Sequence, residues 1–130
     1  MAVVGLSRDP TKPSYEVAQY LKAHGFRIVP INPSAGDVLD EKAYKSLLDM
    51  PADLRKTIEI VDIFRPSGDA LPIVEQAIQL KKANGKPNAV WMQLGIVNEQ
   101  AAEKARKAGL AVVMDRCMMR EHKRLLSTTA

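Results

Sequence analysis

The first thirty-odd residues constrain the fold more than any other part of the chain, because they read as a strand, a glycine turn, a helix and a second strand. Ala2 to Leu6 is an apolar run too short for a helix, and Gly5 marks a sharp turn where a buried parallel strand would emerge. A helix is predicted from Ser14, its expected N-cap, to His24. The next strand runs from Phe26 to Ile31. The chain therefore opens on a βαβ unit.

The loop between this strand and this helix is rich in hydrogen-bonding side chains, which come from Ser7, Arg8, Asp9, Thr11, Lys12 and Ser14. Backbone N–H groups of the loop and the positive end of the helix converge at the carboxyl edge of the first strand, which suits a phosphate group. Gly5 could serve the turn alone, since glycine tolerates positive φ. The donors behind it favour the close approach of a ligand instead.

The remaining chain repeats the alternation of strand and helix. Further strands are predicted at Ile58–Phe64, Ala89–Gln93 and Leu110–Met114. Further helices are predicted from Ser67 or Asp69 to Ala83, from Asn98 to Gly109 and from Met118 to Leu125, with a short helix near Tyr44 to Leu48. This pattern predicts an α/β fold, a three-layer Rossmann-like doubly wound sheet of about five parallel strands. We expect one domain over residues 1–126 and a flexible tail over 127–130.

Length and composition limit the class of protein. A chain of 130 residues, 46% of them hydrophobic, can bury a core without disulfides or metal. No apolar run approaches a membrane span and no charged leader precedes the first strand, so neither an anchor nor a signal peptide is expected. A single cysteine excludes an intramolecular disulfide, and the cytoplasm is the expected compartment.

The formal charge of +4 does not by itself indicate nucleic acid, because basic residues are mostly dispersed among acidic ones. The more basic segment 104–124 lacks the interleaved aromatic residues that stack on exposed bases. We expect no nucleic-acid partner and no membrane partner. A mild positive field would help to capture a small polyanion.

The common nucleotide motifs are absent. The first turn contains Gly5 alone rather than G-x-G-x-x-G, and the second strand ends in Asn32-Pro33-Ser34 without the acid that holds the ribose of NAD. The nearest acid is Asp37, no arginine stands at that end for NADP, and the Walker pattern is missing. These gaps argue against an NAD enzyme and a nucleoside triphosphatase.

The chain resembles the small stand-alone CoA-binding domain proteins in five strings that occur in this order and spacing: VVGLSRDPTKPSYEVAQYL, VPINP, VDIFRP, AVWMQLGIVNEQAA and MDRCMMREHKRL. That family is similar to the CoA-binding domain of the succinyl-CoA synthetase alpha subunit. The resemblance covers nearly the whole chain, and five ordered segments are far more specific than a lone glycine turn.

The resemblance implies CoA or an acyl-CoA as the ligand, with the pyrophosphate received by the loop and helix start at Gly5, Ser7, Arg8, Lys12 and Ser14. It places the adenosine beside Asn32 and Pro33. The nucleotide or the start of the pantetheine arm would be flanked by Phe64, Arg65 and Pro66. Ligase activity is not implied, because the synthetase needs a phosphorylated histidine from a further domain.

Four other side chains have competing interpretations. Cys117 and His122 could be a nucleophile and its base, but five residues of helix rotate them roughly 140° apart, so we expect a half-buried thiol and a structural histidine bonded to a carboxylate or a carbonyl. Asp62 is expected to cap a neighbouring loop. Arg65 is either a ligand contact or half of a surface ion pair.

The sequence therefore predicts a domain that binds CoA or an acyl-CoA as a carrier, sensor or subunit. We predict no catalytic residues and no metal site, and a homo-oligomer or a partner subunit is possible. Two alternatives stay open, namely a regulatory module for NADP or a similar nucleotide, and an acyl-CoA-processing enzyme that uses Cys117 or a partner subunit.

Overall fold

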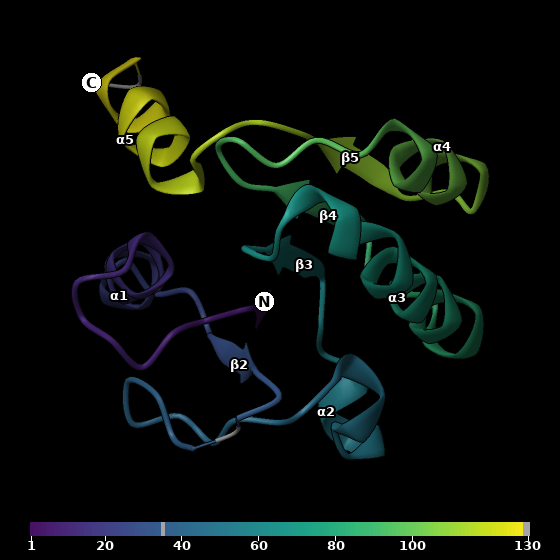
Figure 1. Ribbon diagram of the computed structural model, residues 1–130, viewed down its shortest axis with the longest axis horizontal. Coiled ribbons are helices and arrows are strands. Elements are labelled where there is room, and N and C mark those ends of the chain that lie inside the picture. The colour runs from purple at the N-terminus through teal and green to yellow at the C-terminus, as the bar shows by residue number, and fades with distance from the viewer. Residues whose placement is uncertain (35, 129–130) are drawn as a thin grey trace.

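A five-stranded parallel sheet forms the centre of the molecule in the computed structural model, which describes residues 1–34 and 36–128 (Figure 1). The strands are β1 (Ala2–Val4), β2 (Val29–Ile31), β3 (Ile60–Ile63), β4 (Ala89–Met92) and β5 (Ala111–Val113). Their order is β2-β1-β3-β4-β5, so the direction in which strands are added reverses at β1. The predicted Rossmann-like doubly wound sheet is confirmed.

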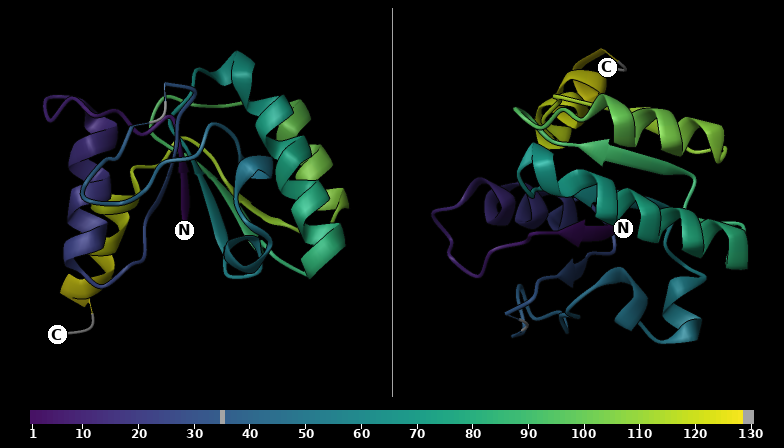
Figure 2. Two further views of the ribbon diagram at one scale, coloured as in Figure 1. Left: turned by 90° about the horizontal axis from the view of Figure 1, so that it is seen from below. Right: turned by 45° about the vertical axis from the view of Figure 1, so that its right-hand side comes forward.

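Helices cover both faces of the sheet (Figure 2). One face is covered by α1 (Pro13–Ala23) and α5 (Met118–Thr128), and the other by α3 (Ala70–Asn84) and α4 (Glu99–Lys107). The short helix α2 (Ala52–Arg55) and the 3₁₀ turns η1 (Leu47–Asp49) and η2 (Ser67–Asp69) lie in the connections around β3. The arrangement is the predicted three-layer sandwich.

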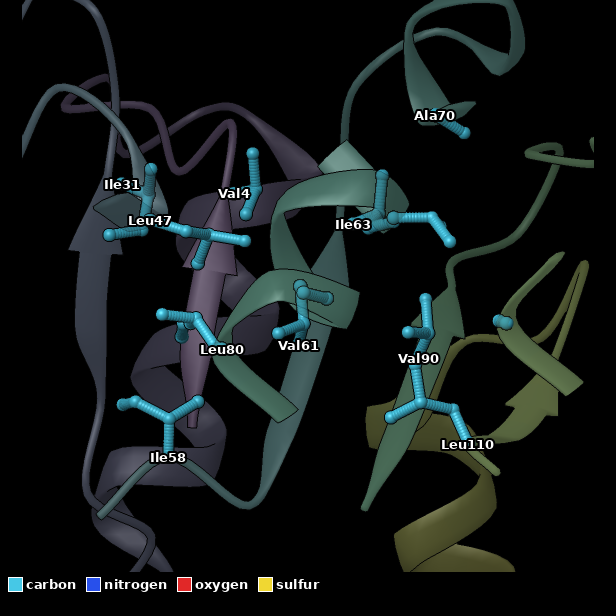
Figure 3. Close-up of a cluster of buried hydrophobic side chains, with 14 of the residues drawn as sticks. Val4, Ile31, Leu47, Ile58, Val61, Ile63, Ala70, Leu80, Val90 and Leu110 are labelled. Atoms are coloured by element: carbon cyan, nitrogen blue, oxygen red, sulfur yellow. The ribbon is translucent and has the colours of Figure 1, made fainter. Parts of the chain in front are cut away.

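Strand residues alternate between two hydrophobic clusters, one on each face. Val61 and Ile63 of β3 belong to the larger cluster, with Leu80 of α3 and Val90 of β4 (Figure 3). The intervening positions of β3 face the α1 and α5 layer, where Val3, Val17, Leu21 and Met118 form the second cluster. Asp62 therefore projects toward α1 and α5, although its strand neighbours are apolar.

The short helix predicted near Tyr44 to Leu48 is present only as the 3₁₀ turn η1, which starts three residues later at Leu47. Tyr44 instead forms a parallel bridge to Ile31, with its N–H donating to the carbonyl of Pro30 at 3.0 Å and its carbonyl accepting from Asn32 at 2.8 Å. This pairing covers the outer edge of β2 and holds the backbone extended. Helical structure begins only at Leu47, in η1.

One predicted helix cap is wrong, one is confirmed in position only, and a third is confirmed. Lys12 is the N-cap of α1, because Pro13 already occupies the first helical turn and Ser14 lies inside the helix. Asp69 is the N-cap residue of α3, one of the two positions predicted, but its side chain makes no capping bond. Asn98 caps α4 as predicted, with Oδ1 accepting from the N–H of Ala101 at 2.9 Å.

The C-terminal helix is longer than predicted. It reaches Thr128, so two residues of the expected tail are helical, and residues 129–130 lie outside the described residues. No helix within residues 1–34 and 36–128 is both long and apolar enough to cross a membrane. In the same part of the chain, no three His, Cys, Asp or Glu side chains gather as a metal ion would require.

Candidate functional site

Gly5 forms the turn at the carboxyl end of β1, at the point where the strand order reverses. Its φ is +87°, and its N–H donates to the carbonyl of Ile31 at 2.8 Å. A Cβ at this position would lie 3.0 Å from Cδ of Arg65 and 3.2 Å from the carbonyl carbon of Phe64. Glycine is needed here for the turn and because the side chain of Arg65 lies so close to it. From the sequence, the close approach of a ligand had been predicted instead.

The loop after Gly5 is held together by its own side chains. Oγ of Ser14 accepts from the N–H of Ser7 at 3.0 Å, and Oγ of Ser7 accepts from the N–H of Asp9 at 3.0 Å. The backbone N–H and the hydroxyl of Thr11 both donate to Asp9, which lowers the pKa of that carboxyl. These groups shape the loop before any ligand is present. Within the described residues, no acceptor receives the N–H of Ser14 near the start of α1.

The main pocket lies at the carboxyl edge of the sheet, on the α1 and α5 side, and measures about 600 Å³. Among the residues predicted from the sequence, it brings together Gly5, Ser7, Lys12, Ser14 and Phe64. Its wall is completed by residues that follow β4 and β5 and by residues of α1 and α5, including Gln93, Leu94, Ile96, Cys117, Met119 and Arg120. The ends of four strands therefore contribute to one cavity, as expected where a doubly wound sheet reverses.

A second pocket of about 320 Å³ lies on the α3 side of the same edge. Its lining includes Pro33 and Arg65 of the predicted site, together with Lys45, Ser46 and Asp69. Nη2 of Arg65 lies 3.0 Å from Oδ2 of Asp69, so the ion pair considered from the sequence is present. The stem of Arg65 lies against Gly5, so a residue that lines the second pocket packs beside one that lines the main pocket.

Three residues of the predicted site line neither pocket. Both functional groups of the Asn32 amide are bonded within the chain, with Nδ2 donating to the carbonyl of Leu6 and Oδ1 accepting from the N–H of Ser34, each at 2.9 Å. Arg8 lies beside Gly36, where a Cβ would come within 2.8 Å of its Nη1. Pro66 begins the turn into η2, and its carbonyl accepts from Asp69 at 2.8 Å.

A buried polar pair lies next to the main pocket and was not predicted from the sequence. Nε2 of Gln93 donates to Oδ1 of Asp62 at 2.6 Å, and Oε1 of Gln93 accepts from the N–H of Met118 at 3.1 Å. Asp62 is fully buried, and burial raises its pKa to about 7. The prediction that Asp62 caps a loop is wrong, because its partner is a side chain after the adjacent strand. The position of Gln93 at a strand's carboxyl end was the available signal.

Cys117 and His122 are directed to different surroundings. Cys117 lines the main pocket, whereas Nδ1 of His122 lies 2.8 Å from the hydroxyl of Tyr20 and its ring packs against His24 and Phe26. The two residues therefore do not form a nucleophile and base pair. His122 is structural as predicted, but its partner is a tyrosine hydroxyl rather than a carboxylate or a carbonyl.

A family profile described as CoA binding domain matches residues 1–123. The chain belongs to this CoA-binding domain family. An uncharacterized protein of Bacillus subtilis, YneT, is 32% identical over 122 residues, which cover 94% of this chain and 84% of that protein. Acetate–CoA ligase [ADP-forming] II of Archaeoglobus fulgidus is 40% identical over 60 residues, 45% of this chain but only 9% of the ligase.

Solved structures share the architecture of this CoA-binding domain. A hypothetical protein from Pyrococcus horikoshii OT3 superposes with a TM-score of 0.86 at 42% identity, covering 96% of this chain and 82% of that one. A protein from Thermus thermophilus superposes with a TM-score of 0.84 at 36% identity, covering 95% of this chain and 87% of that one. The family and the fold thus agree over nearly the whole chain.

The chemistry of the two pockets suits a ligand with both phosphate and apolar parts. Lys12 and Arg120 bring cations to the main pocket, and Lys45 and Arg65 bring cations to the second. The main pocket is also lined by apolar side chains such as Val17, Phe64, Ile96 and Met119. CoA joins phosphates to a pantetheine arm, so the residues present fit it.

Proposed function

We propose that the chain binds CoA or an acyl-CoA at the carboxyl edge of its sheet, as a carrier, sensor or subunit without catalysis of its own. The observation that carries this proposal is that two pockets lie at this edge of the sheet, with a lining residue of one, Gly5, beside a lining residue of the other, Arg65. A long ligand such as CoA could occupy both cavities at once. Membership of the CoA-binding domain family supports the choice of ligand.

In the proposed binding mode, the main pocket takes the pyrophosphate and the pantetheine arm. The cation of Lys12 and the N–H of Ser14 at the start of α1 would receive a phosphate, aided by the positive end of the helix. Gly5 and Ser7 would form the floor beside it, and Phe64 would flank the pantetheine. Arg8 would add a charge outside the pocket.

The adenosine end would lie in the second pocket. Pro33 would border the adenine, and Arg65 and Lys45 would supply positive charge for a phosphate of the nucleotide. Asn32 would act by holding the loop in place, since its amide is already bonded. Pro66 would act by setting the turn after Arg65.

The experiment that tests this function is calorimetric titration with CoA, acetyl-CoA, NAD and NADP under one buffer condition. We expect the two CoA compounds to bind more tightly than either dinucleotide, because the acid that holds the NAD ribose is absent. Equal or tighter binding of NAD or NADP would reject the proposal in favour of a dinucleotide-sensing module. Native mass spectrometry of freshly purified protein provides an independent check, because a retained ligand reports its own mass.

The chain matches only a small part of each ligase, which bears on what it could do alone. The matching region makes up 9% of the Archaeoglobus ligase and 14% of the ligase alpha subunit from Pyrococcus furiosus. We therefore propose that this chain supplies CoA binding only, and that a partner subunit would supply any chemistry on the acyl group. Co-purification from the native source, with and without added CoA, tests for such a partner.

A second candidate function is acyl transfer from an acyl-CoA to the Cys117 thiol, which is favoured by the place of this thiol in the wall of the main pocket. Incubation with acetyl-CoA, followed by intact-mass measurement, distinguishes the two functions. A stable gain of one acetyl group that is lost in Cys117→Ser would favour the enzyme. An unchanged mass would favour the binding protein.

A further inference from the structure

A buried polar pair beside the main pocket is not used by the proposed binding mode. Gln93 is 2% exposed and lines the pocket, and Asp62 is fully buried and bonded to it at 2.6 Å. Oδ2 of Asp62 has no hydrogen-bond partner within residues 1–34 and 36–128. An ionised carboxylate is costly in such surroundings, because one of its oxygens receives no donor. The pair is therefore suited to holding a neutral acid.

We propose that binding of CoA in the main pocket is coupled to the uptake of a proton by Asp62, with the Gln93 amide as the link between the carboxyl and the pocket. This inference rests on the proposed function, since it takes the CoA anion as the occupant of the main pocket. It adds a pH dependence that simple binding of an anion would not require.

Two effects of a bound ligand act on Asp62 in the same direction. The negative charge of the phosphates disfavours a second negative charge nearby, and a ligand that covers Gln93 excludes water from the pair. Both effects favour the protonated form. Linkage is reciprocal, so a protein in which Asp62 is already protonated binds the anion more tightly.

A pKa near neutrality would let a bound ligand change the protonation of Asp62 under ordinary conditions. Burial raises the pKa of Asp62 to about 7, while the hydrogen bond from Gln93 and the positive amino group of Met1 act in the opposite direction. A ligand can therefore shift the proton occupancy appreciably under ordinary conditions. A carboxyl that stayed ionised throughout this range would offer no such response.

Hydrogen bonds at both its oxygen and its nitrogen fix the orientation of the Gln93 side-chain amide. Oε1 of Gln93 accepts from the N–H of Met118, the first residue of α5, while Nε2 donates to Asp62. The amide cannot rotate without losing one of these bonds. Because Cys117 and Met119 on either side of Met118 line the pocket, the pair also supports part of the pocket wall.

Other titratable groups lie on the elements that pack over this face, and the experiment must separate them from Asp62. They are the amino group of Met1, Tyr15 and Tyr20 from α1, Cys117 and His122 at α5, and Lys12, Glu16 and Arg120 at the pocket. Histidine is the side chain that ordinarily titrates between pH 5 and 8. His122 therefore needs its own control variant.

The main experiment is calorimetric titration of the wild-type protein at pH 7 in two buffers that differ in ionisation enthalpy, with dephospho-CoA as the probe. This probe lacks the 3′-phosphate, so its own charge stays constant near neutral pH. We expect a net uptake of a fraction of a proton per ligand at pH 7, because the bound anion favours the protonated form of Asp62. We also expect the affinity to fall roughly three- to tenfold between pH 6 and pH 8.

Three variants identify the side chain that takes up the proton when the ligand binds. Asp62→Asn should abolish both the uptake and the pH dependence, whereas His122→Gln and Asp53→Asn, which removes an exposed carboxyl on α2, should retain them. Binding without proton uptake in the wild type would overturn the coupling. Uptake that persists in Asp62→Asn would overturn it as well.

A measurement on the wild type covers the case in which Asp62→Asn does not fold. The carboxyl carbon resonance of Asp62, followed by NMR, should titrate near pH 7 in the free protein and at higher pH with dephospho-CoA bound. An unmoved midpoint would overturn the proposal. If neither CoA nor dephospho-CoA binds at any pH, the proposed function itself is rejected, and the coupling with it. Binding without proton uptake would reject only the coupling.

Discussion

Nδ2 of Asn32 donates to the carbonyl of Leu6 at 2.9 Å, so the end of β2 holds the loop that leaves β1. The N–H of Gly5 donates to the carbonyl of Ile31 at 2.8 Å, which makes a second tie between the same two segments. The shape of the glycine loop therefore depends on a residue 26 positions away along the chain. Asn32 has a structural role here whatever ligand the site receives.

We expect Asn32→Asp to lower the free energy of unfolding by about 1–3 kcal/mol, because a carboxylate cannot donate to the Leu6 carbonyl and leaves it unpaired. Urea denaturation above pH 6 measures the change. Asn88→Asp is the matched control, since Asn88 is exposed and its replacement should change stability by less than about 0.5 kcal/mol. Equal losses in both variants would contradict the role given to Asn32.

Gly5→Ala should cost more stability than Gly25→Ala, although both residues have positive φ, at +87° and +90°. A Cβ on Gly25 meets nothing within 4 Å, whereas a Cβ on Gly5 meets Cδ of Arg65 at 3.0 Å. Gly25→Ala should therefore lose only the backbone term of about 1–2 kcal/mol. The excess loss at Gly5 should shrink when Arg65→Ala is added, and a double-mutant cycle by thermal unfolding measures it. An excess that persists unchanged would show that Arg65 is not the obstacle.

Arg65→Ala should weaken CoA binding roughly tenfold or more, because a charge-assisted contact to phosphate is worth about 1.5–3 kcal/mol. Its stability should stay within about 1 kcal/mol of wild type, since the ion pair to Asp69 is about half exposed on both sides. Asp69→Ala breaks the same ion pair but keeps the cation, so it should not weaken CoA binding. If the two variants lose affinity equally, the ion pair matters rather than a contact of Arg65 with the ligand.

Cys117→Ser should leave CoA affinity within a factor of about three, because the thiol is part of the wall and the hydroxyl is only slightly smaller. Cys117→Phe should reduce the affinity strongly by filling the same part of the pocket. Both are measured by titration calorimetry. Unchanged binding in Cys117→Phe would show that CoA does not use this part of the main pocket.

The stability of the wild type relative to Asp62→Asn should fall as pH rises from about 4 to about 7. The folded-state pKa of Asp62 is raised to about 7 from its ordinary value of 3.8, so the folded protein binds more protons than the unfolded chain in this window. The favourable contribution is complete below the unfolded pKa and is lost above pH 7, a change of up to roughly 4 kcal/mol. Urea unfolding at pH 5 and pH 8 measures it. A constant difference between the two proteins would contradict the raised pKa.

The sequence predicted those features that depend on neighbouring residues. Gly5 after an apolar run predicted the first turn, and Asn98 before a helical segment predicted a cap that the structure contains. The role of Ser14 was mispredicted, because the N-cap lies two residues earlier, at Lys12, and the Ser14 hydroxyl instead accepts from the N–H of Ser7. Whether the Ser14 hydroxyl caps the helix or bonds to the loop depends on where the loop backbone passes. The spacing of nearby residues in the sequence does not indicate this.

Features that depend on distant residues were not predicted. Asp62 and Gln93 are 31 residues apart, and their bond follows from the pairing of β3 with β4. The bridge between Tyr44 and Ile31 likewise depends on a returning segment at the sheet edge. The close packing of the Arg65 side chain against Gly5 also joins residues that are far apart in the sequence. None of these has a periodic signal in the sequence.

The strand order also bears on how the chain assembles during synthesis. Strand order and chain order coincide from β1 onward, since β3 lies beside β1, β4 beside β3 and β5 beside β4. If the chain folds from its N-terminal side during synthesis, each later strand would find its edge already in place. Cys117 and Met119, in the wall of the main pocket, follow all five strands in the chain, so every strand would be released before this wall could form.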